Sequence, residues 1–361
     1  MAINKKAFYR LDNILACKCY YMILFGMRAN GKSYAVKEYT LKRAYENGEG
    51  FAYLRRWSED IKTKDVAAYF DDMPISELTA GEWDSVTAWQ GYFYFSTCGD
   101  DGKVKRSAKP IGRYCSLNQA ERYKSQVFNV ERIIYEEFLT DKIYLGSAIK
   151  PEPDILLQFV STVARDKNIQ VFLIGNTISR VCPYFMSWNL HDVLRMKPGE
   201  IQVYHLRGDN GVVDIAVENC EVVARESKMF FGNTSKQIIS GEWEVNDYPR
   251  LPKPWEYYEM LYELVLRSDA FKYVLQLLYD PENGGSCVFI YPSTKARKIR
   301  RVVTDKFSTD PFVTNGLNPE IGAEALMMRC FRDGKVCYSD NLTGTDFRQV
   351  IEQYHLRGLK A

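Results

Sequence analysis

The sequence predicts an α/β fold built on a mostly parallel sheet, followed by a smaller α+β unit. Three observations predict it: short uninterrupted apolar runs, segments of helical periodicity between those runs, and a change of composition after residue 225. Apolar runs of about 4–8 residues are typical of strands buried on both faces. Strands that alternate with helices imply right-handed crossovers and parallel pairing.

The first half of the chain begins with an apolar strand over 20–26 and an amphipathic helix over 32–48. A second helix is expected over 58–70, opened by Ser58 with acidic residues in its first turn. A third helix is expected over 151–166, where two prolines stand at the start.

The remaining strands of this half have apolar or alternating sequences: 50–56, 89–97, 130–138, 168–176, 200–208 and 212–223. Residues 89–97 alternate as an antiparallel strand does, and a polar, basic loop is expected over 99–110. The last two strands form a predicted hairpin around the sequence GDNG.

The composition changes after residue 225, where Gly, Asn, Ser and three prolines gather within a few residues. We therefore expect a first domain over 1–225, a linker module over 226–255 and a C-terminal domain over 256–361. The elements expected in the last part are four strands and a closing helix: 271–280, 286–293, 298–307, 335–340 and 347–358.

Charge and composition exclude several classes of protein. Lys and Arg number 48 and Asp and Glu 46, so the net charge of +2 excludes a protein that coats DNA through its overall charge. It leaves open a protein that contacts nucleic acid through a few loops. Nine scattered cysteines without a C-x-x-C pair, and only three histidines, argue against a zinc cluster. No apolar stretch approaches the about 20 residues of a membrane span, so we expect no membrane partner.

The strongest motif is Gly26–Ser33, GMRANGKS, which matches the phosphate-binding pattern G-x-x-x-x-G-K-S. Gly26 and Gly31 let the backbone curl so that successive N–H groups face phosphates, at the positive end of the following helix. Lys32 would neutralise the β- and γ-phosphates of ATP, and the Ser33 hydroxyl would ligate Mg²⁺. A buried strand before the loop and an amphipathic helix after it supply the required context.

Two carboxylates, Glu136 and Glu137, follow the apolar core of the strand over 130–138. We assign Glu136 to Mg²⁺ and Glu137 to the general base that polarises the attacking water. Aspartate is usual at the metal position, and Glu136 is one methylene longer. Asn176, at the end of the strand over 168–176, is the candidate polar sensor, with an ordinary turn residue as the alternative. Adjacent glutamates, without an N/T-K-x-D motif, favour an ATPase that performs mechanical work over a GTPase switch.

These motifs resemble those of the genome-packaging ATPases of small tailed podophages, the phi29-like encapsidation motors. The resemblance runs in order over most of residues 20–190, through GMRANGKSYAVK, FAYLRRW, IIYEEF, STVARD and LIGNT followed by VCPYF. Its specific features are Arg28 inside the phosphate loop, the arginine pair on the second strand, and an Asn followed by Pro-Tyr-Phe. Past residue 225 only the succession of strands is similar.

The resemblance implies a homomeric ring, with five subunits expected, that docks on the capsid portal in the host cytoplasm and drives double-stranded DNA inward. Arg165 matches the family's arginine finger, which reaches a neighbour's γ-phosphate. Lys167 is the alternative finger, and an arginine that complements the helix dipole is the structural alternative. Arg55 matches an arginine of the lid region and is expected near the nucleotide. Lys142 matches a channel-facing lysine that would contact DNA phosphates regardless of sequence. One basic family position is Ser58 here.

Two basic segments are further candidates for contact with nucleic acid. The first lies in the loop over 99–110, where the alternative is solvated surface: Lys103, Lys105, Arg106 and Lys109. The C-terminal domain of the family resembles an RNase H-like nuclease without its carboxylates. Its presumed central strand over 286–293 holds no acid here, so no nuclease is expected. The second segment suits a structural RNA or DNA, with a solvated edge strand as the alternative: Lys295, Arg297, Lys298, Arg300 and Arg301.

The sequence therefore predicts an ATP-hydrolysing subunit of a DNA-translocating motor. The alternative enzymes are a helicase, or a terminase with an active nuclease. The alternative outside enzymes is a nucleotide-gated assembly protein in which Glu136 and Glu137 bind metal without turnover.

Overall fold

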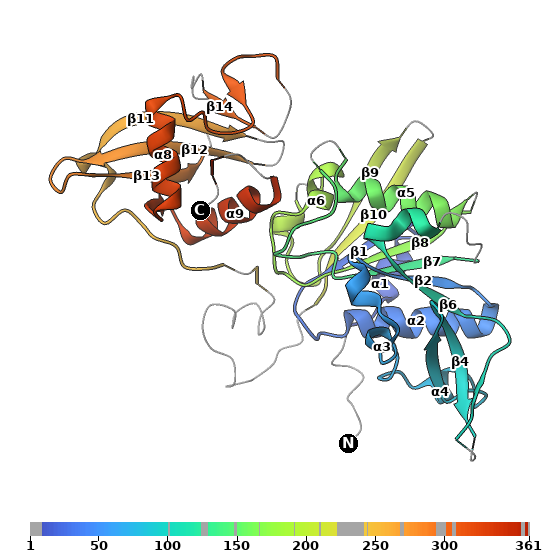
Figure 1. The fold of residues 1–361 in the computed structure, drawn as a ribbon. Helices are drawn as coiled ribbons and strands as arrows, with labels where there is room; N and C mark the ends of the chain where they lie inside the picture. Colours follow the sequence, from blue (N-terminus) through green and yellow to red (C-terminus); the bar gives the residue numbers. More distant parts are fainter. Residues whose placement is uncertain are drawn as a thin grey trace, which may run out of the picture.

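The structure is a computed structural model of the 361-residue chain. It describes residues 9–99, 102–123, 129–147, 150–165, 167–190, 192–208, 211–221, 242–243, 245–267, 271–293, 301–304, 308–354 and 358–359. These residues form two separate sheets, each with its own hydrophobic core (Figure 1). Most of the predicted linker module, residues 222–241 and 244, lies outside the described residues.

The first sheet has ten strands among the described residues, in the order β3-β4-β6-β2-β7-β8-β1-β10-β9, with β5 paired to β4. The bounds are β1 Tyr21–Phe25, β2 Phe51–Arg55, β3 Ser85–Trp89, β4 Tyr92–Cys98, β5 Val104–Arg106, β6 Gly112–Ser116, β7 Arg132–Glu136, β8 Gln170–Ile174, β9 Ile201–Gly208 and β10 Gly211–Asn219. The six strands from β6 to β10 in this order pair in parallel. The predicted mostly parallel sheet is therefore confirmed, with antiparallel strands only toward its two edges.

Helices cover both faces of this sheet (Figure 1). Their bounds are α1 Asp12–Ala16, α2 Lys32–Asn47, α3 Thr63–Val66, α4 Ile75–Leu78, α5 Glu152–Ala164 and α6 Pro183–Ser187. Side chains alternate along each central strand, so Leu24 packs on the α2 face while Ile23 packs on the α5 face. Burial on both faces explains why these strands appear in the sequence as continuous apolar runs.

Three local predictions were wrong in detail. The expected helix over 58–70 is a 3₁₀ turn at Ser58–Ile61 and the short α3, separated by an extended Lys62. The helix does not continue because Tyr69 and Phe70 turn inward to pack around Phe93. The single strand over 89–97 is a hairpin between β3 and β4, because Gln90 and Gly91 adopt left-handed backbone conformations. The expected loop over 99–110 contains β5.

The second sheet has the order β15-β14-β11-β12-β13-β16 within the described part of the chain. Its elements are β11 Glu259–Arg267, β12 Lys272–Asp280, β13 Gly285–Pro292, β14 Val302–Val303, β15 Val313–Thr314, α8 Gly322–Arg332, β16 Val336–Tyr338 and α9 Asn341–Tyr354. Both helices pack on one face, around Leu264, Leu275 and Ile290. The sequence missed β11 and α8, and α9 begins at Asn341 rather than at residue 347. The strand presumed central, β13, lies next to the edge strand β16.

One short segment after β8 joins the two cores. Val181 is buried in the core of the second sheet although it follows a strand of the first. The Ser179 hydroxyl donates to Gln349 of α9 at 2.9 Å, and the Gln353 amide donates to the Val181 carbonyl at 3.1 Å. The end of β8 is therefore attached directly to α9. In the described residues no helix is both long and apolar enough to cross a membrane.

Candidate functional site

The phosphate-loop motif forms the connection between β1 and α2. Gly26 and Gly31 have φ of 140° and 100°, conformations that residues with a Cβ rarely adopt. A Cβ on Gly26 would also stand 3.2 Å from the Cys220 carbonyl oxygen of the strand end beside it. The α-helix starts at Lys32, so the first N–H groups of α2 open toward the loop.

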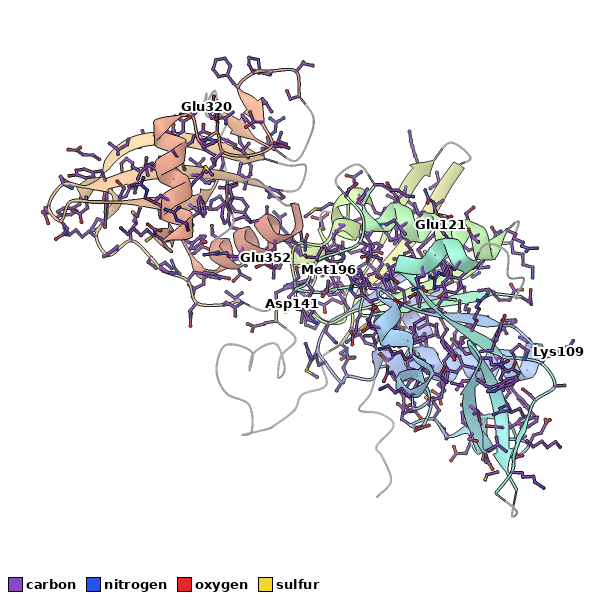
Figure 2. All side chains as sticks on the ribbon, in the orientation of Figure 1. Lys109, Glu121, Asp141, Met196, Glu320 and Glu352 are labelled. Carbon is purple, nitrogen blue, oxygen red and sulfur yellow. The ribbon has the colours of Figure 1, made fainter. Side chains whose placement is uncertain are left out.

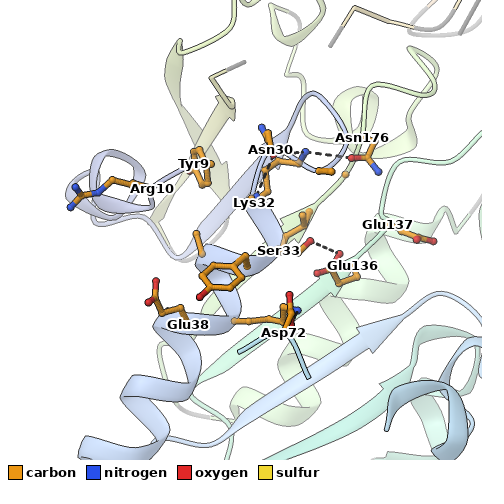
Figure 3. Close-up of a pocket in the computed structure, with 17 residues that line it drawn as sticks. Tyr9, Arg10, Asn30, Lys32, Ser33, Glu38, Asp72, Glu136, Glu137 and Asn176 are labelled. Atoms are coloured by element: carbon orange, nitrogen blue, oxygen red, sulfur yellow. Dashed lines mark hydrogen bonds and ion pairs between the residues drawn. The ribbon is translucent and has the colours of Figure 1, made fainter. Parts of the chain in front are cut away.

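The loop borders a pocket of about 930 Å³ (Figure 3). Its lining comes from the N-terminal segment, the loop and α2, the segment between α3 and α4, and the ends of β7 and β8: Tyr9, Arg10, Ala29, Asn30, Gly31, Lys32, Ser33, Tyr34, Ala35, Lys37, Glu38, Asp72, Glu136, Glu137, Ile174, Gly175 and Asn176. The structure therefore brings together the predicted lysine, serine, carboxylates and sensor from three separate stretches of sequence.

Lys32 lies inside the loop with its ammonium group on backbone and amide oxygens. Its Nζ donates to the Met27 carbonyl at 2.6 Å, to Asn30 Oδ1 at 3.2 Å and to Asn176 Oδ1 at 3.4 Å. Burial lowers the pKa of Lys32 to about 8. A buried cation surrounded by neutral dipoles gains most from an incoming anion, so this geometry suits a phosphate.

Glu136 is 8% exposed at the end of β7 and faces Ser33 (Figure 3). The Ser33 hydroxyl donates to its Oε2 at 3.2 Å, and the Tyr69 hydroxyl donates to its Oε1 at 3.1 Å. Burial raises the pKa of Glu136, against the effect of these two hydrogen bonds. A hydroxyl and a carboxylate at this spacing fit Mg²⁺, which prefers oxygen ligands and is usually shared with substrate phosphates.

Glu137 lies beside Glu136 but points away from Ser33 (Figure 3). Its backbone has φ of 56°, and its carboxylate accepts a hydrogen bond from Arg55 at 2.6 Å. The same Arg55 guanidinium lies 3.9 Å from Asp60. Arg55 therefore contacts the predicted base in this structure, rather than facing the pocket.

A buried network beneath Glu137 was missed by the sequence analysis. Glu152 is fully buried and accepts hydrogen bonds from Arg56 Nε at 2.7 Å and from the hydroxyls of Tyr135 and Tyr184 at 2.6 and 3.0 Å. Arg56 also donates to the carbonyls of Glu137 and Phe138, at 3.1 and 2.7 Å. The arginine pair on the second strand was a signal, but only Arg55 received a role.

The two finger candidates lie near the beginning of β7, at the opposite ends of the strands from the pocket. Arg165 follows α5 and borders a small cavity with Val130, which precedes β7, whereas the pocket lies at the far end of β7. Lys167 pairs with Glu131 at 2.8 Å. Neither residue lines its own subunit's pocket. Arg28 is an exposed part of the phosphate loop, close enough to Lys32 to lower its pKa further.

The predicted nucleic-acid contacts that the structure describes lie on several different elements. Lys142 borders a groove of about 440 Å³ together with Trp57, Asp141 and Glu352, and the last two are labelled in Figure 2. The predicted contacts at β5 are exposed on the first sheet: Lys103, Lys105 and Arg106. In the C-terminal segment Arg301 is buried and ion-paired with Glu324, so its guanidinium is not presented to a nucleic acid. The other four predicted cations lie outside the described residues: Lys295, Arg297, Lys298 and Arg300.

The N-terminal segment contributes Tyr9 and Arg10 to the lining of the pocket. The Tyr9 N–H donates to the Asn30 carbonyl at 3.0 Å, and the Tyr9 hydroxyl donates to Glu218 of β10 at 2.6 Å. Burial raises the pKa of Glu218 from 4.5 to about 7. At pH 5–6 the folded chain therefore holds a proton that the unfolded chain has released.

We expect the folded chain to become less stable as the pH rises, because Glu218 then loses this proton. The folded state binds more protons than the unfolded state between about pH 4.5 and 7, so the free energy of unfolding falls across this window, by up to about 3 kcal/mol from this group. Urea unfolding at pH 5, 6 and 7 should show a smaller fall for Glu218→Gln than for the wild type. The control is Glu256→Gln, on an exposed carboxylate of the described residues before β11. Identical pH dependence of the wild type and Glu218→Gln would contradict the assignment.

Comparisons with known proteins agree with the resemblance found in the sequence. A family model described as podovirus DNA encapsidation protein (Gp16) matches residues 3–233. The DNA packaging proteins of Bacillus phages phi29 and PZA are each 31% identical over 194 residues, which are 52% of this chain and 52% of theirs. The chain thus spans about half the length of the curated relatives it matches.

A solved structure shows that the fold is shared. A chain of the bacteriophage Phi-29 viral genome packaging motor assembly has a TM-score of 0.57 and 20% sequence identity, over 98% of this chain and 100% of that one. The family model covers more than half of the 361 residues. On that match, with the phosphate loop and paired glutamates in place, the chain belongs to the podovirus DNA encapsidation protein family.

Proposed function

We propose that the chain is an ATP-hydrolysing motor subunit that translocates double-stranded viral DNA into a preformed capsid. One observation carries the proposal: a phosphate-loop motif and the adjacent carboxylates Glu136 and Glu137 meet at one pocket in a chain of the encapsidation family. The names of its relatives, DNA packaging proteins and a genome packaging motor, support DNA and a capsid as partners.

In the proposed mechanism Lys32 exchanges its carbonyl partners for the β- and γ-phosphate oxygens of ATP. Ser33 and Glu136 would hold Mg²⁺, which would neutralise charge on the phosphates. Glu137 accepts the proton of the attacking water after its ion pair with Arg55 opens. Asn176 already contacts Lys32, and it senses the γ-phosphate from the end of β8.

We propose that Arg165 acts on the pocket of a neighbouring subunit. Arg165 lies at the opposite ends of the strands from the pocket and does not line the pocket of its own subunit, which supports action in trans. A finger supplied in this way can raise the rate about 10³–10⁵-fold. This requires a homo-oligomeric ring, for which we expect five subunits.

The remaining assignments follow from the same proposal. The chain acts in the host cytoplasm at the capsid portal. Lys142, Lys103 and Lys105 face DNA, and a structural RNA is a further partner. We propose an ATPase domain over 1–225, a linker over 226–255, and a vestigial nuclease-like domain over 256–361. The two parallel-paired edges of the second sheet and its two helices are compatible with that last assignment.

The test is steady-state ATP hydrolysis against protein concentration, with and without double-stranded DNA. Turnover should rise with both, because the pocket needs a neighbour's arginine. Arg165→Ala should abolish it, and admixed Glu137→Gln subunits should restore it by donating their own Arg165. Lys167→Ala is the matched control and should retain activity.

Two outcomes would favour other functions. ATP hydrolysis that depends neither on protein concentration nor on DNA, and that Arg165→Ala leaves unchanged, would contradict the ring motor. Nucleotide binding without multiple turnovers would instead support the nucleotide-gated assembly protein.

A further inference from the structure

The carboxylate of Glu136 is held from two sides. Ser33 donates to one oxygen at 3.2 Å, and the hydroxyl of Tyr69 donates to the other at 3.1 Å. Ser33 belongs to the phosphate loop, whereas Tyr69 comes from the irregular segment between α3 and α4. Nothing in the phosphate-loop motif itself requires a tyrosine at this place.

Tyr69 is itself firmly held. Its ring lies over Tyr53 of β2 with the centroids 4.1 Å apart, and Phe70 contacts it edge-on at 4.7 Å. Its backbone carbonyl accepts a hydrogen bond from Lys37 Nζ at 2.9 Å, and the same ammonium pairs with Asp72. Lys37 lies about one helical turn after Ser33, so it ties the segment that carries Tyr69 to the helix that carries the metal-binding serine.

This support matters because the metal position carries a glutamate. The longer side chain has one more rotatable bond than the usual aspartate, and Mg²⁺ demands near-ideal geometry with short ligand distances. A ligating carboxylate is commonly fixed by an outer hydrogen bond, whose loss costs about 10–100-fold in metal affinity or activity. Tyr69 supplies that bond on the oxygen that Ser33 does not contact.

We propose that Tyr69 is a positioning residue that fixes Glu136 in its metal-binding orientation and so adapts the phosphate site to a glutamate. The inference rests on the proposed function, since it concerns the Mg²⁺ that accompanies ATP. The competing explanation is that Tyr69 only fills the aromatic cluster around Phe93. The two differ in whether the hydroxyl group, rather than the ring, affects metal binding.

The test is equilibrium binding of a fluorescent ATP analogue to the full chain, as MgCl₂ is titrated and also in EDTA. Tyr69→Phe keeps the ring and removes the hydroxyl, and it should raise the half-saturating Mg²⁺ concentration about tenfold. Binding in EDTA should not change. The matched control is Tyr39→Phe, which removes a hydroxyl that donates to Gln170 at 3.1 Å, far from the pocket.

A double-mutant cycle with Glu136→Asp makes the test specific to the pair. The shorter aspartate cannot reach Tyr69 in the same way. In the Glu136→Asp background, Tyr69→Phe should therefore raise the half-saturating Mg²⁺ concentration by less than about twofold. Unchanged Mg²⁺ dependence of Tyr69→Phe, or an equal loss with Mg²⁺ and with EDTA, would overturn the inference while the wild type still binds MgATP. If the wild type bound the ATP analogue equally well with Mg²⁺ and with EDTA, the proposed function would be overturned as well.

Discussion

Replacing Glu137 by Gln is expected to lower the rate of ATP hydrolysis about 10²–10⁴-fold while nucleotide binding persists. The amide keeps the size of the side chain and one acceptor oxygen, but it carries no negative charge and cannot accept the proton of the attacking water. Lys32, Ser33 and Glu136, which we expect to bind MgATP, are left untouched. Single-turnover hydrolysis and binding of a fluorescent analogue, measured on the same preparation, would separate the two effects.

The control for this prediction is Glu38→Gln, because Glu38 lines the same pocket from α2 without facing the phosphate loop. It should hydrolyse ATP within a few-fold of the wild type. If Glu137→Gln hydrolysed ATP at the wild-type rate, Glu137 would not be the general base, and Glu136 would be the remaining candidate.

The contact between Arg55 and Glu137 adds a constraint on this step. The carboxylate accepts a 2.6 Å hydrogen bond from the guanidinium here, so the oxygen that takes part in this bond is occupied and does not face an attacking water. Hydrolysis therefore requires that the pair open or lengthen. We therefore expect Arg55 to influence when Glu137 acts.

Replacing Glu152 by Ala is expected to destabilise the folded chain by about 3–5 kcal/mol. The change leaves the buried Arg56 guanidinium without its counter-charge, and it removes the acceptor of two buried tyrosine hydroxyls. It also loosens the backbone of Glu137, whose carbonyl Arg56 holds. Urea unfolding followed by tryptophan fluorescence would measure the loss.

The matched control is Glu131→Ala, which breaks the exposed ion pair with Lys167 and should cost less than about 1 kcal/mol. Replacing both Arg56 and Glu152 by leucine should destabilise less than Glu152→Ala alone, because no charge is then left buried without a partner. A loss below about 1 kcal/mol for Glu152→Ala would show that the network contributes little to stability.

Much of the first sheet was predictable because its signals are local. Five-residue apolar strands and the glycine spacing of Gly26–Ser33 lie within short windows, and parallel pairing follows from the alternation with helices. The predicted ends of β7 and β8 lie two residues beyond the observed ones, and Glu136 and Asn176 were nevertheless singled out before their place at the pocket was known. What each of them does stays a prediction.

The parts that were missed depend on partners far away in the sequence. Tyr69 contacts Glu136 across 67 residues, and Arg56 contacts Glu152 across 96. In the sequence Glu152 is indistinguishable from an acid at a helix N-terminus, because only the fold reveals that it is fully buried. Arg301 was misassigned for the same reason, since its partner Glu324 belongs to a helix that the sequence analysis did not detect.

The burial of Val181 beside α9 also bears on how the subunit is made. During synthesis the end of β8, with Asn176, leaves the ribosome about 160 residues before α9, and domains tend to fold from the N-terminus as they emerge. Until α9 arrives, Val181 has no core to enter and Ser179 lacks Gln349. The segment next to the candidate sensor is thus completed last. A nascent chain can form the phosphate loop early, but it reaches the full geometry around Asn176 only after the second sheet has folded.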